Sequence, residues 1–544
     1  MGPNFKASLE IIETLLASGV KEFCVCAGSR NSPLVSVLSS GAFDLRIYSF
    51  PDERAAAFYA LGRCQLTNKP VAVVTTSGTA AAEMLPAVIE AHYSKWPLIC
   101  VTADRPRHYR GTGAPQSIEQ LNLYGTYVEA CIDFEAGEKW DLKAWGRQRP
   151  LHINVCFDEP LIDGEISSML DVNVEEPRKS PRLALTSSPS FTETHAAVQE
   201  IEAFLNKCKR PLVIVAALLP SEREPVRAFL AKLHAPIWAE ALSGLREDVI
   251  LESCLLKSGE RILARGGFDG VLRIGGVPTL RYWRDLESQA GEKLPVCHIS
   301  RVPFTGLTRG IKAFGDVART LTMLENAPSF ELPAELFQLD RSLQERFQEI
   351  ILEQPRSELA LIHSFSRFVP PRSKIFLGNS LPIREWDLAS TRRFRGLECR
   401  GNRGANGIDG EVSTFLGQCD PELSNWALLG DLTTIYDLSA PWVVPQLPET
   451  LSFQIVVINN GGGRIFSRVR SLDPVDPDTR KSLFENSHGV RFGDWARMWN
   501  LGFEEWTEMP PQPPASSQGV VELRPDTDSS QRAWELYDRL WSVS

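Results

Sequence analysis

Two stretches near the C-terminus carry residue types that could hold a cation beside an anion. Gly430, Asp431 and Leu432 close one apolar run, and Asn460, followed by three glycines, closes the next. A carboxylate, an amide oxygen and the carbonyl of Gly462 are hard oxygen ligands of the kind that Mg²⁺ or Mn²⁺ binds, with a diphosphate supplying further oxygens. Glycines let the backbone approach such an anion closely. Each stretch alone is also typical of a β-turn, and only the pair predicts a metal and diphosphate site.

Glu53 is the candidate for proton chemistry. It follows an apolar run and opens a strongly apolar helical stretch. An acid in a first helical turn is favoured by the helix dipole by less than about 1 kcal/mol, which would be a purely structural role. An apolar pocket around the same carboxyl would instead raise its pKa and suit it to catalysis. Both interpretations stay open for this residue alone.

Four arginines stand in loops after apolar runs, where a parallel sheet binds its ligands. They are Arg30, Arg105, Arg384 and Arg403. A single arginine in a loop is usually a solvated surface charge. Because guanidinium groups bind carboxylates as two-pronged forks, four of them at corresponding positions predict a substrate with more than one carboxylate.

Small and apolar residues complete the candidate site. One predicted strand-to-helix turn could direct its amides at an anion or only cap a helix. Ile408 is a bulky residue among glycines, so it is either a packing residue or an apolar wedge against a ligand. Ile465 and Phe466 follow the glycines of the metal stretch and could form a pocket wall. The turn is the TTSGT stretch at residues 75–79, which includes Thr76, Ser77 and Gly78.

Alternating strands and helices must position these residues, which predicts α/β architecture. We expect three domains, at residues 1–180, 190–345 and 355–544, with a linker over 172–190. The first strands are expected at 21–28, 45–50, 71–78, 97–104 and 151–158. Those of the middle domain are expected at 210–220, 235–240, 268–276 and 294–300. Those of the third are expected at 373–380, 397–407, 425–432, 452–460 and 520–526.

Composition excludes several classes of protein. Of the 544 residues, 43% are hydrophobic and 23% charged, as in ordinary globular proteins, and the net charge of −10 comes without long charged blocks, so nucleic acid is not an expected partner. The eleven cysteines form no CxxC pair, and the eight histidines form no cluster typical of zinc. No signal-like start or membrane-length apolar run is present, so we expect a cytoplasmic protein without membrane insertion.

Taken together, the motifs resemble those of one family of thiamine diphosphate enzymes. The GDL triplet at 430–432, followed after the 26 residues 433–458 by NN, is similar to the diphosphate-and-metal motif of such enzymes. Leu432 stands where glycine is more common, which narrows the match to one family. The family is 2-succinyl-5-enolpyruvyl-6-hydroxy-3-cyclohexene-1-carboxylate synthase, of menaquinone biosynthesis. The motifs are GSRNSPL, PDERAAAFYALG, VTTSGTAAAEMLPAVIEA, TADRP, GAPQ, GNSLPIR, NRGANGIDG, GDLTTIYDL and NNGGGRIF.

The resemblance implies a fold, a cofactor and a reaction. It implies three doubly wound parallel-sheet domains, namely a pyrimidine-binding domain, a central domain and a diphosphate- and metal-binding domain, in a homodimer or homotetramer. It implies a transferase that uses thiamine diphosphate and Mg²⁺ (or Mn²⁺), decarboxylates 2-oxoglutarate and adds the succinyl-semialdehyde carbanion equivalent to isochorismate. Glu53 would act on ring nitrogen N1′ of the cofactor, across the subunit interface from Asp431 and Asn460.

The resemblance also assigns residues. The metal ligands would be Asp431, Asn460 and Gly462, and Ile408 would be the wedge. The cofactor residues would be Glu53, Thr76, Ser77, Gly78, Ile408, Gly430, Asp431, Leu432, Asn460 and Ile465. Those around substrates and intermediates would be Ser29, Arg30, Arg105, Gln116, Arg281, Ser380, Arg384, Arg403, Ile465 and Phe466. The catalytic residues would be Glu53, Ile408, Arg384 and Arg403.

The chain departs from the family pattern at a few positions. Pro115 stands where the family often has asparagine, which removes a side-chain donor near isochorismate. Gly461 and Arg464 replace more polar, uncharged residues of the metal stretch.

Two alternatives follow from the same motifs. One is another thiamine diphosphate carboligase or 2-oxoacid decarboxylase, similar to acetolactate synthase, although a small monoanionic substrate would not need the arginines. The other is a non-catalytic, cofactor-binding relic. The presence of both Glu53 and the metal stretch in one chain argues against this second alternative.

Overall fold

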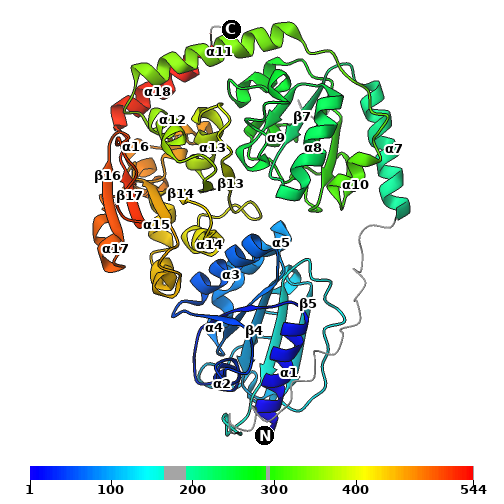
Figure 1. The fold of residues 1–544 in the computed structure, drawn as a ribbon, viewed down its shortest axis with the longest axis vertical. Helices are drawn as coiled ribbons and strands as arrows, with labels where there is room; N and C mark the ends of the chain where they lie inside the picture. Colours follow the sequence, from blue (N-terminus) through cyan, green and yellow to red (C-terminus); the bar gives the residue numbers. More distant parts are fainter. Residues whose placement is uncertain (165–190, 289–293, 543–544) are drawn as a thin grey trace. The chain divides into compact units, whose positions relative to one another are not determined.

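The computed structural model describes residues 1–164, 191–288 and 294–542 (Figure 1). The predicted linker at 172–190 and the boundaries at 180 and 190 therefore fall outside the described residues. By their internal contacts the residues form two units, which we describe separately. The first unit comprises Met1–Ser187, Gly404–Asp420 and Thr433–Leu451, and the second comprises Ser188–Arg403, Pro421–Leu432 and Ser452–Ser544.

A parallel sheet of six strands, sheet A, forms the first unit, in the order β2-β1-β3-β4-β6-β5. Strands β3 and β4 are buried along their whole length, because α1 and α2 pack on one face of the sheet and α3 on the other. The strands are β1 (Glu22–Val25), β2 (Arg46–Ser49), β3 (Val71–Thr75), β4 (Leu98–Asp104), β5 (Ala130–Glu135) and β6 (Leu151–Cys156). The helices are α1 (Pro3–Ala17), α2 (Ser32–Leu38), α3 (Glu53–Thr67), α4 (Thr79–Glu83), α5 (Leu85–Ser94) and α14 (Glu411–Gln418).

Helix α14 lies against α3 at backbone distance. A Cβ atom on Gly62 would sit 2.2 Å from the carbonyl oxygen of Thr414, and one on Gly417 would sit 2.3 Å from that of Tyr59. Only glycine fits at these two positions, so the two helices approach more closely than side chains would allow. Residues 404–420 thus group with the first sheet although they lie far along the sequence.

The second unit holds two parallel sheets. Sheet B has five strands in the order β11-β10-β9-β7-β8. Its strands are β7 (Pro211–Val215), β8 (Ile237–Ala239), β9 (Gly270–Ile274), β10 (Val296–Ser300) and β11 (Ile311–Phe314). Helices of this part of the chain are α7 (Phe191–Lys207), α8 (Pro220–Leu233), α9 (Arg281–Asp285), α10 (Val317–Thr322) and α11 (Ala334–Glu353).

Sheet C has six parallel strands in the order β13-β12-β14-β15-β17-β16. Its strands are β12 (Lys374–Leu377), β13 (Glu398–Arg400), β14 (Asn425–Gly430), β15 (Phe453–Ile458), β16 (Gly502–Trp506) and β17 (Gln518–Leu523). The helices are α12 (Glu358–Phe368), α13 (Leu381–Ala389), α16 (Pro477–Thr479), α17 (Gly493–Met498) and α18 (Thr527–Leu540). Helix α15 (Asp431–Tyr436) follows β14, and from Thr433 on its residues belong to the first unit. One continuous apolar core, which includes Trp238, Phe347 and Trp386, joins sheets B and C.

Sheets A and C have the same topology. Counted along the chain within each sheet, both follow the spatial order 2-1-3-4-6-5, and sheet B follows 2-1-3-4-5. In such sheets ligands bind beyond the carboxyl ends of the strands, at the point where the winding direction changes between strands 1 and 3. The topology therefore predicts one ligand-binding edge in sheet A and one in sheet C.

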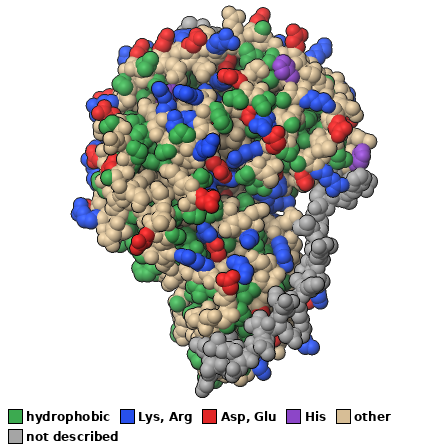
Figure 2. Space-filling model, in the orientation of Figure 1, with side chains coloured by type: hydrophobic (Ala, Val, Ile, Leu, Met, Phe, Trp, Pro, Cys, Tyr) green, Lys and Arg blue, Asp and Glu red, His purple; other side chains and the backbone are tan. Residues whose placement is uncertain are grey.

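The surface carries charges of both signs. Figure 2 shows lysine and arginine interspersed with aspartate and glutamate on the face drawn, which fits a modest net charge of −10. None of the helices among the described residues combines the length and the apolar character needed to cross a bilayer.

Candidate active site

The loops that follow strands β1, β3 and β4 contact one another at the carboxyl edge of sheet A. A Cβ atom on Gly28 would lie 2.5 Å from that of Thr76, so the first two loops touch at that glycine. Gly78 has φ +84°, and a Cβ atom there would lie 3.2 Å from Cα of Gln116. The hydroxyl of Thr76 is buried without a hydrogen-bond partner. The structure thus brings Thr76, Ser77, Gly78 and Gln116 together at one edge.

Glu53 begins α3 at the same edge. The Asp52 side chain caps this helix by accepting a hydrogen bond from the Ala55 amide at 3.1 Å, which fixes the first turn. Glu53 is half-buried, and burial is the main cause that raises its pKa, with Asp52 and Glu83 adding to the effect. A carboxyl group with a raised pKa holds its proton more readily, as a hydrogen bond to a ring nitrogen requires.

Ile408 belongs to a segment that the first unit fixes firmly. The buried carboxylate of Glu90 accepts hydrogen bonds from the amides of Gly404 and Ala405, both at 2.6 Å. Gly410 lies against Phe58 in the second turn of α3, because a Cβ atom there would be only 1.9 Å from the ring. The segment that carries Ile408 therefore runs along the helix that begins at Glu53.

The two arginines of sheet A have different surroundings. Arg30 is buried, donates a hydrogen bond to the carbonyl of Phe157 at 3.0 Å and lies 3.4 Å from the carboxylate of Glu159. Arg105 is half-buried and donates through Nε to the carbonyl of Pro115 at 3.0 Å. The proline that departs from the family pattern therefore still supplies an oxygen, which orients Arg105. Ser29, next to Arg30, is exposed.

A buried polar network that sequence reasoning did not single out supports this edge. Gln120 is fully buried, accepts from the Gly78 amide at 2.8 Å and donates to Asn154 at 2.8 Å. Asn154 in turn donates to Asp104 at 3.1 Å and to Asp133 at 2.8 Å. Because these residues are far apart in sequence and belong to no local motif, no pattern in the chain pointed to them.

Asp431 is the central residue at the carboxyl edge of sheet C. It follows β14 and is buried, and it accepts hydrogen bonds from the amides of Leu432 at 2.6 Å and of Gly461 and Gly462, each at 2.9 Å. Burial raises the pKa of Asp431, while these amides and nearby His488 act in the opposite direction. Gly430 ends β14 directly before it. The carboxylate is thus fixed before any ligand arrives.

Asn460 presents a free oxygen beside Asp431. Its Nδ2 donates to both carboxylate oxygens of Glu358, at 3.2 and 3.0 Å, which fixes the orientation of the amide. Its Oδ1 is buried and has no hydrogen-bond partner. A buried acceptor without a partner is costly, and a cation would satisfy it. The donor set of Asp431, Asn460 and the Gly462 carbonyl therefore fits a small hard cation with diphosphate.

Arg464, a departure from the family pattern, has a structural role in the glycine stretch. Its Nε donates to the Asn460 carbonyl at 3.1 Å, and its Nη1 donates to Glu485 at 2.9 Å. The Arg464 amide also donates to the Gly462 carbonyl at 2.8 Å, which leaves that oxygen a second lone pair. Gly462 has φ +137°, and a Cβ atom there would be 2.5 Å from the carbonyl of Glu485.

The two apolar residues that follow the glycine stretch are less buried than Asp431. Ile465 and Phe466 lie in the 3-10 helix η7 (Arg464–Arg468) and are both half-buried. The ring of Phe466 meets that of Phe484 edge-on, with 6.1 Å between centroids. Together they leave apolar surface beside the metal stretch.

Three further predicted residues lie at the carboxyl edge of sheet C. Ser380 has φ +70°, unusual for a residue other than glycine, and its carbonyl accepts a hydrogen bond from Arg384, which is otherwise exposed. Arg403 follows β13 and donates to Asn379 at 2.6 Å. Strained backbone of this kind is often found at functional sites.

Arg281 lies at the start of α9, in the part of the chain that forms sheet B. Its Nε is 3.4 Å from Asp285, and both side chains are more than half exposed. Its amide donates to Glu260 at 2.7 Å. The structure gives this arginine a surface ion pair.

Comparison with known proteins identifies the family. Residues 6–123 match the model of the thiamine pyrophosphate enzyme, N-terminal TPP binding domain. Over 99% of this chain and 99% of the relative, the sequence is 41% identical to the 2-succinyl-5-enolpyruvyl-6-hydroxy-3-cyclohexene-1-carboxylate synthase of Bdellovibrio bacteriovorus. The chain belongs to this synthase family. The family and the thiamine pyrophosphate-dependent enzyme class expected from the sequence are confirmed.

Other members of the synthase family and one solved structure agree. The chain is 37% identical to the synthase of Akkermansia muciniphila, over 96% of this chain and 97% of that one. It is 32% identical to the synthase of Listeria innocua, over 91% of this chain and 89% of that one. Its fold is similar to that of benzoylformate decarboxylase from Polynucleobacter necessarius, with a TM-score of 0.69 over 96% of this chain and 98% of that one at 14% identity. The predicted α/β class with three parallel sheets is confirmed.

Proposed function

We propose that this chain decarboxylates 2-oxoglutarate and adds the remaining four-carbon unit to isochorismate, giving 2-succinyl-5-enolpyruvyl-6-hydroxy-3-cyclohexene-1-carboxylate and CO₂. The product is the compound in the relatives' names, and the full-length match to them carries the proposal. The protein would be a cytoplasmic transferase of menaquinone biosynthesis. Bound thiamine pyrophosphate would supply the carbon centre that attacks the oxo acid and accepts the electrons left behind by CO₂.

Glu53 would hold a proton at the cofactor's pyrimidine ring nitrogen. The support is its position at the start of α3 and the burial that raises its pKa. Thr76, Ser77 and Gly78 would line the pyrimidine side, and Ile408 would press against the cofactor from the segment that runs along α3.

Asp431, Asn460 and the Gly462 carbonyl would hold Mg²⁺ or Mn²⁺, and through it the diphosphate. The support is the fixed carboxylate of Asp431 and the buried, unpartnered oxygen of Asn460. Among the described residues, no three His, Cys, Asp or Glu side chains gather as a metal cage. Mg²⁺ commonly takes one or two carboxylates plus phosphate oxygens and water, so this donor set is sufficient. Gly430, Leu432 and Ile465 would border the cofactor.

The substrates would bind to positively charged side chains at the carboxyl edges of sheets A and C. Their carboxylates would bind Arg384 and Arg403 from sheet C and Arg105 from sheet A, because arginine pairs with carboxylates in two-pronged geometry. Arg30 would contribute from the buried position where Glu159 now lies 3.4 Å away. The further candidates are Ser29, Gln116, Arg281, Ser380, Ile465 and Phe466.

We further propose that the two edges of one site come from different copies of the chain, in a homodimer or homotetramer. The support is the family resemblance. Mixing two inactive variants, Glu53→Gln and Asp431→Ala, tests this arrangement. If the edges meet between copies, a mixed dimer contains one intact site, and the mixture regains about a quarter of wild-type activity. If both edges belong to one copy, the mixture stays inactive.

The proposed reaction is tested by following the loss of isochorismate absorbance in the presence of 2-oxoglutarate, thiamine pyrophosphate and Mg²⁺. We expect loss that requires all components, with product confirmed by mass spectrometry. Well-folded protein that consumes 2-oxoglutarate but leaves isochorismate unchanged would favour the alternative of another 2-oxoacid decarboxylase. Folded protein that binds the cofactor without any turnover would favour a non-catalytic relic.

A further inference from the structure

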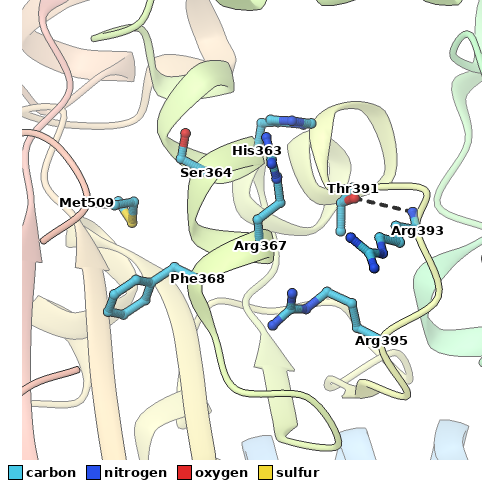
Figure 3. Close-up of a pocket in the computed structure, with 8 residues that line it drawn as sticks. All are labelled: His363, Ser364, Arg367, Phe368, Thr391, Arg393, Arg395 and Met509. Atoms are coloured by element: carbon cyan, nitrogen blue, oxygen red, sulfur yellow. Dashed lines mark hydrogen bonds between the residues drawn. The ribbon is translucent and has the colours of Figure 1, made fainter. Parts of the chain in front are cut away.

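A pocket of about 550 Å³ lies in the second unit (Figure 3). It is built from the last turns of α12 and from the segment between α13 and β13, with Met509 on a further side. Figure 3 shows Arg367, Arg393 and Arg395 around one open space, with Phe368 and Met509 to one side. None of these residues is among those assigned to the cofactor or the substrates.

The pocket lies at the opposite edge of sheet C from Asp431. The carbonyl of Arg395 accepts a hydrogen bond from the Arg372 amide at 3.0 Å, just before β12 begins. The same segment leads into the start of β13. All strands of sheet C are parallel, so the pocket is at the edge where strands begin, whereas Asp431 and Asn460 follow the ends of strands. The pocket is therefore separate from the proposed active site.

The pocket holds more positive charge than hydrogen bonds and ion pairs within the described residues account for. Arg395 caps α12 by donating to the carbonyl of Val369, and its Nε is buried without a partner. A cation at a helix C-terminus is favourable, which accounts for this one side chain. The guanidinium groups of Arg367 and Arg393 have no hydrogen-bond or ion-pair partner among the described residues. No acidic residue of the described chain lines the pocket.

Two groups in the pocket respond to this positive charge. Burial lowers the pKa of Arg395, and Arg393 and Arg367 lower it further by repulsion. Burial also lowers the pKa of His363, whose Nδ1 lies 2.9 Å from the carbonyl of Ala389. An anion bound among the three guanidinium groups would relieve their mutual repulsion.

We propose that this pocket binds a small organic dianion, either a dicarboxylate or a phosphate monoester, whose anionic groups are attached to an apolar body. The guanidinium groups of Arg367 and Arg393 would pair with the anionic groups, because arginine forms paired hydrogen bonds with both carboxylate and phosphate. Phe368 and Met509 would contact the apolar body. A volume of about 550 Å³ is in the range of pockets for small molecules.

The test is titration of the full-length protein, saturated with thiamine pyrophosphate and Mg²⁺, by calorimetry at 150 mM salt. Phenyl phosphate and isophthalate are the probes, because they share an apolar ring and two negative charges and differ in the anionic group. We expect saturable binding of at least one probe. The double variant Arg367→Ala/Arg393→Ala should weaken it at least 10-fold, and the stronger probe identifies the preferred group.

The matched control is Arg341→Ala/Arg346→Ala, which removes two exposed arginines from α11 and so the same net charge. The control should bind the probe as the wild type does. Equal weakening in both double variants, or no saturable binding of either probe, overturns the proposal. Should the pocket variant fold poorly, phenylglyoxal labelling of the wild type serves instead. The probe should protect Arg367 and Arg393 but not Arg341, and equal labelling with and without probe refutes the site.

Discussion

The carboxyl edges of sheets A and C follow one strand order but hold their polar groups in different ways. At sheet C, three backbone amides fix Asp431, and Glu358 fixes Asn460. At sheet A, Glu53 is only half-buried, and the Thr76 hydroxyl is buried without a partner. One edge is thus a rigid set of acceptors suited to a cation, and the other carries a carboxyl whose pKa burial raises. Topology determines where a ligand binds, and local sequence determines the chemistry there.

The largest effect should come from Glu53→Gln. This variant shows whether the carboxyl edge of sheet A contributes to the chemical step or to cofactor binding. We expect a loss of about 1000-fold in turnover and little change in affinity for thiamine pyrophosphate, because the carboxyl acts on a proton. NMR exchange of the cofactor's C2 proton measures the step directly. Glu83→Gln, at an exposed neighbouring acid, is the control and should exchange normally. Wild-type exchange in Glu53→Gln would remove the residue from its role.

Asp431→Ala should remove the fixed carboxylate of the proposed metal site at the carboxyl edge of sheet C. We expect Mn²⁺ affinity, followed by electron paramagnetic resonance, to fall at least 100-fold, together with the diphosphate affinity that depends on it. Asp437→Ala is a matched control, because Asp437 is also buried and accepts a hydrogen bond from a backbone amide, that of Ser413, at 2.7 Å. The control should lower the melting temperature without changing Mn²⁺ affinity. Similar Mn²⁺ affinity in the two variants would show that Asp431 is only structural.

Glu358→Gln should have a smaller effect on the same edge. A glutamine can donate as well as accept, so the Asn460 amide would no longer be held in one orientation. We expect Mn²⁺ affinity about 10-fold weaker, with activity recovered at high metal concentration. Glu335→Gln, at an exposed acid of α11, should change neither quantity. Activity that high metal does not restore would argue against a positioning role.

The smallest effect concerns the carboxyl edge of sheet B, where Glu240 has a structural role. Burial, helped by Asp387, raises the pKa of Glu240 to about 7, and the Thr279 amide donates to it at 2.5 Å. The native state therefore binds this proton more tightly than the unfolded state, so stability from Glu240 is present at low pH and is lost as pH rises from about 4.5 to about 7.

Glu240→Gln should flatten that pH dependence. We expect the difference in unfolding free energy between the wild type and the variant to change by on the order of 1–3 kcal/mol across this pH range. Urea unfolding at several pH values measures it, with Glu252→Gln at an exposed position as the control. Parallel pH profiles for the wild type and Glu240→Gln would contradict the assignment.

The sequence predicted the inner strands of all three sheets but missed one edge strand in each. The missed strands are β5, β11 and β16. Their residues are mostly half-buried or exposed, so they lack the continuous apolar run that marks a strand covered on both faces. The predicted domain ranges stay a prediction, and a linear division cannot express that residues 404–420 group with sheet A.

The same limit applies to the site. Asp431, Asn460 and Glu53 were predictable because each stands at the end of an apolar run, next to glycine or at a helix start. Glu358 and Gln120 were not, since each acts on a residue that is distant in sequence and belongs to no local motif. Whether the predicted cofactor and substrate residues act as assigned stays a prediction for the experiments above.

The contact between α3 and α14 has a mechanical consequence. Because Gly62 and Gly417 bring backbone against backbone, neither helix can slide along the other without a steric clash. Glu53 begins one of these helices, and Ile408 lies three residues before the other. A shift of Glu53 along its helix axis must therefore carry the Ile408 segment with it. The close helix contact at Gly62 and Gly417 thus sets the distance between Glu53 and Ile408.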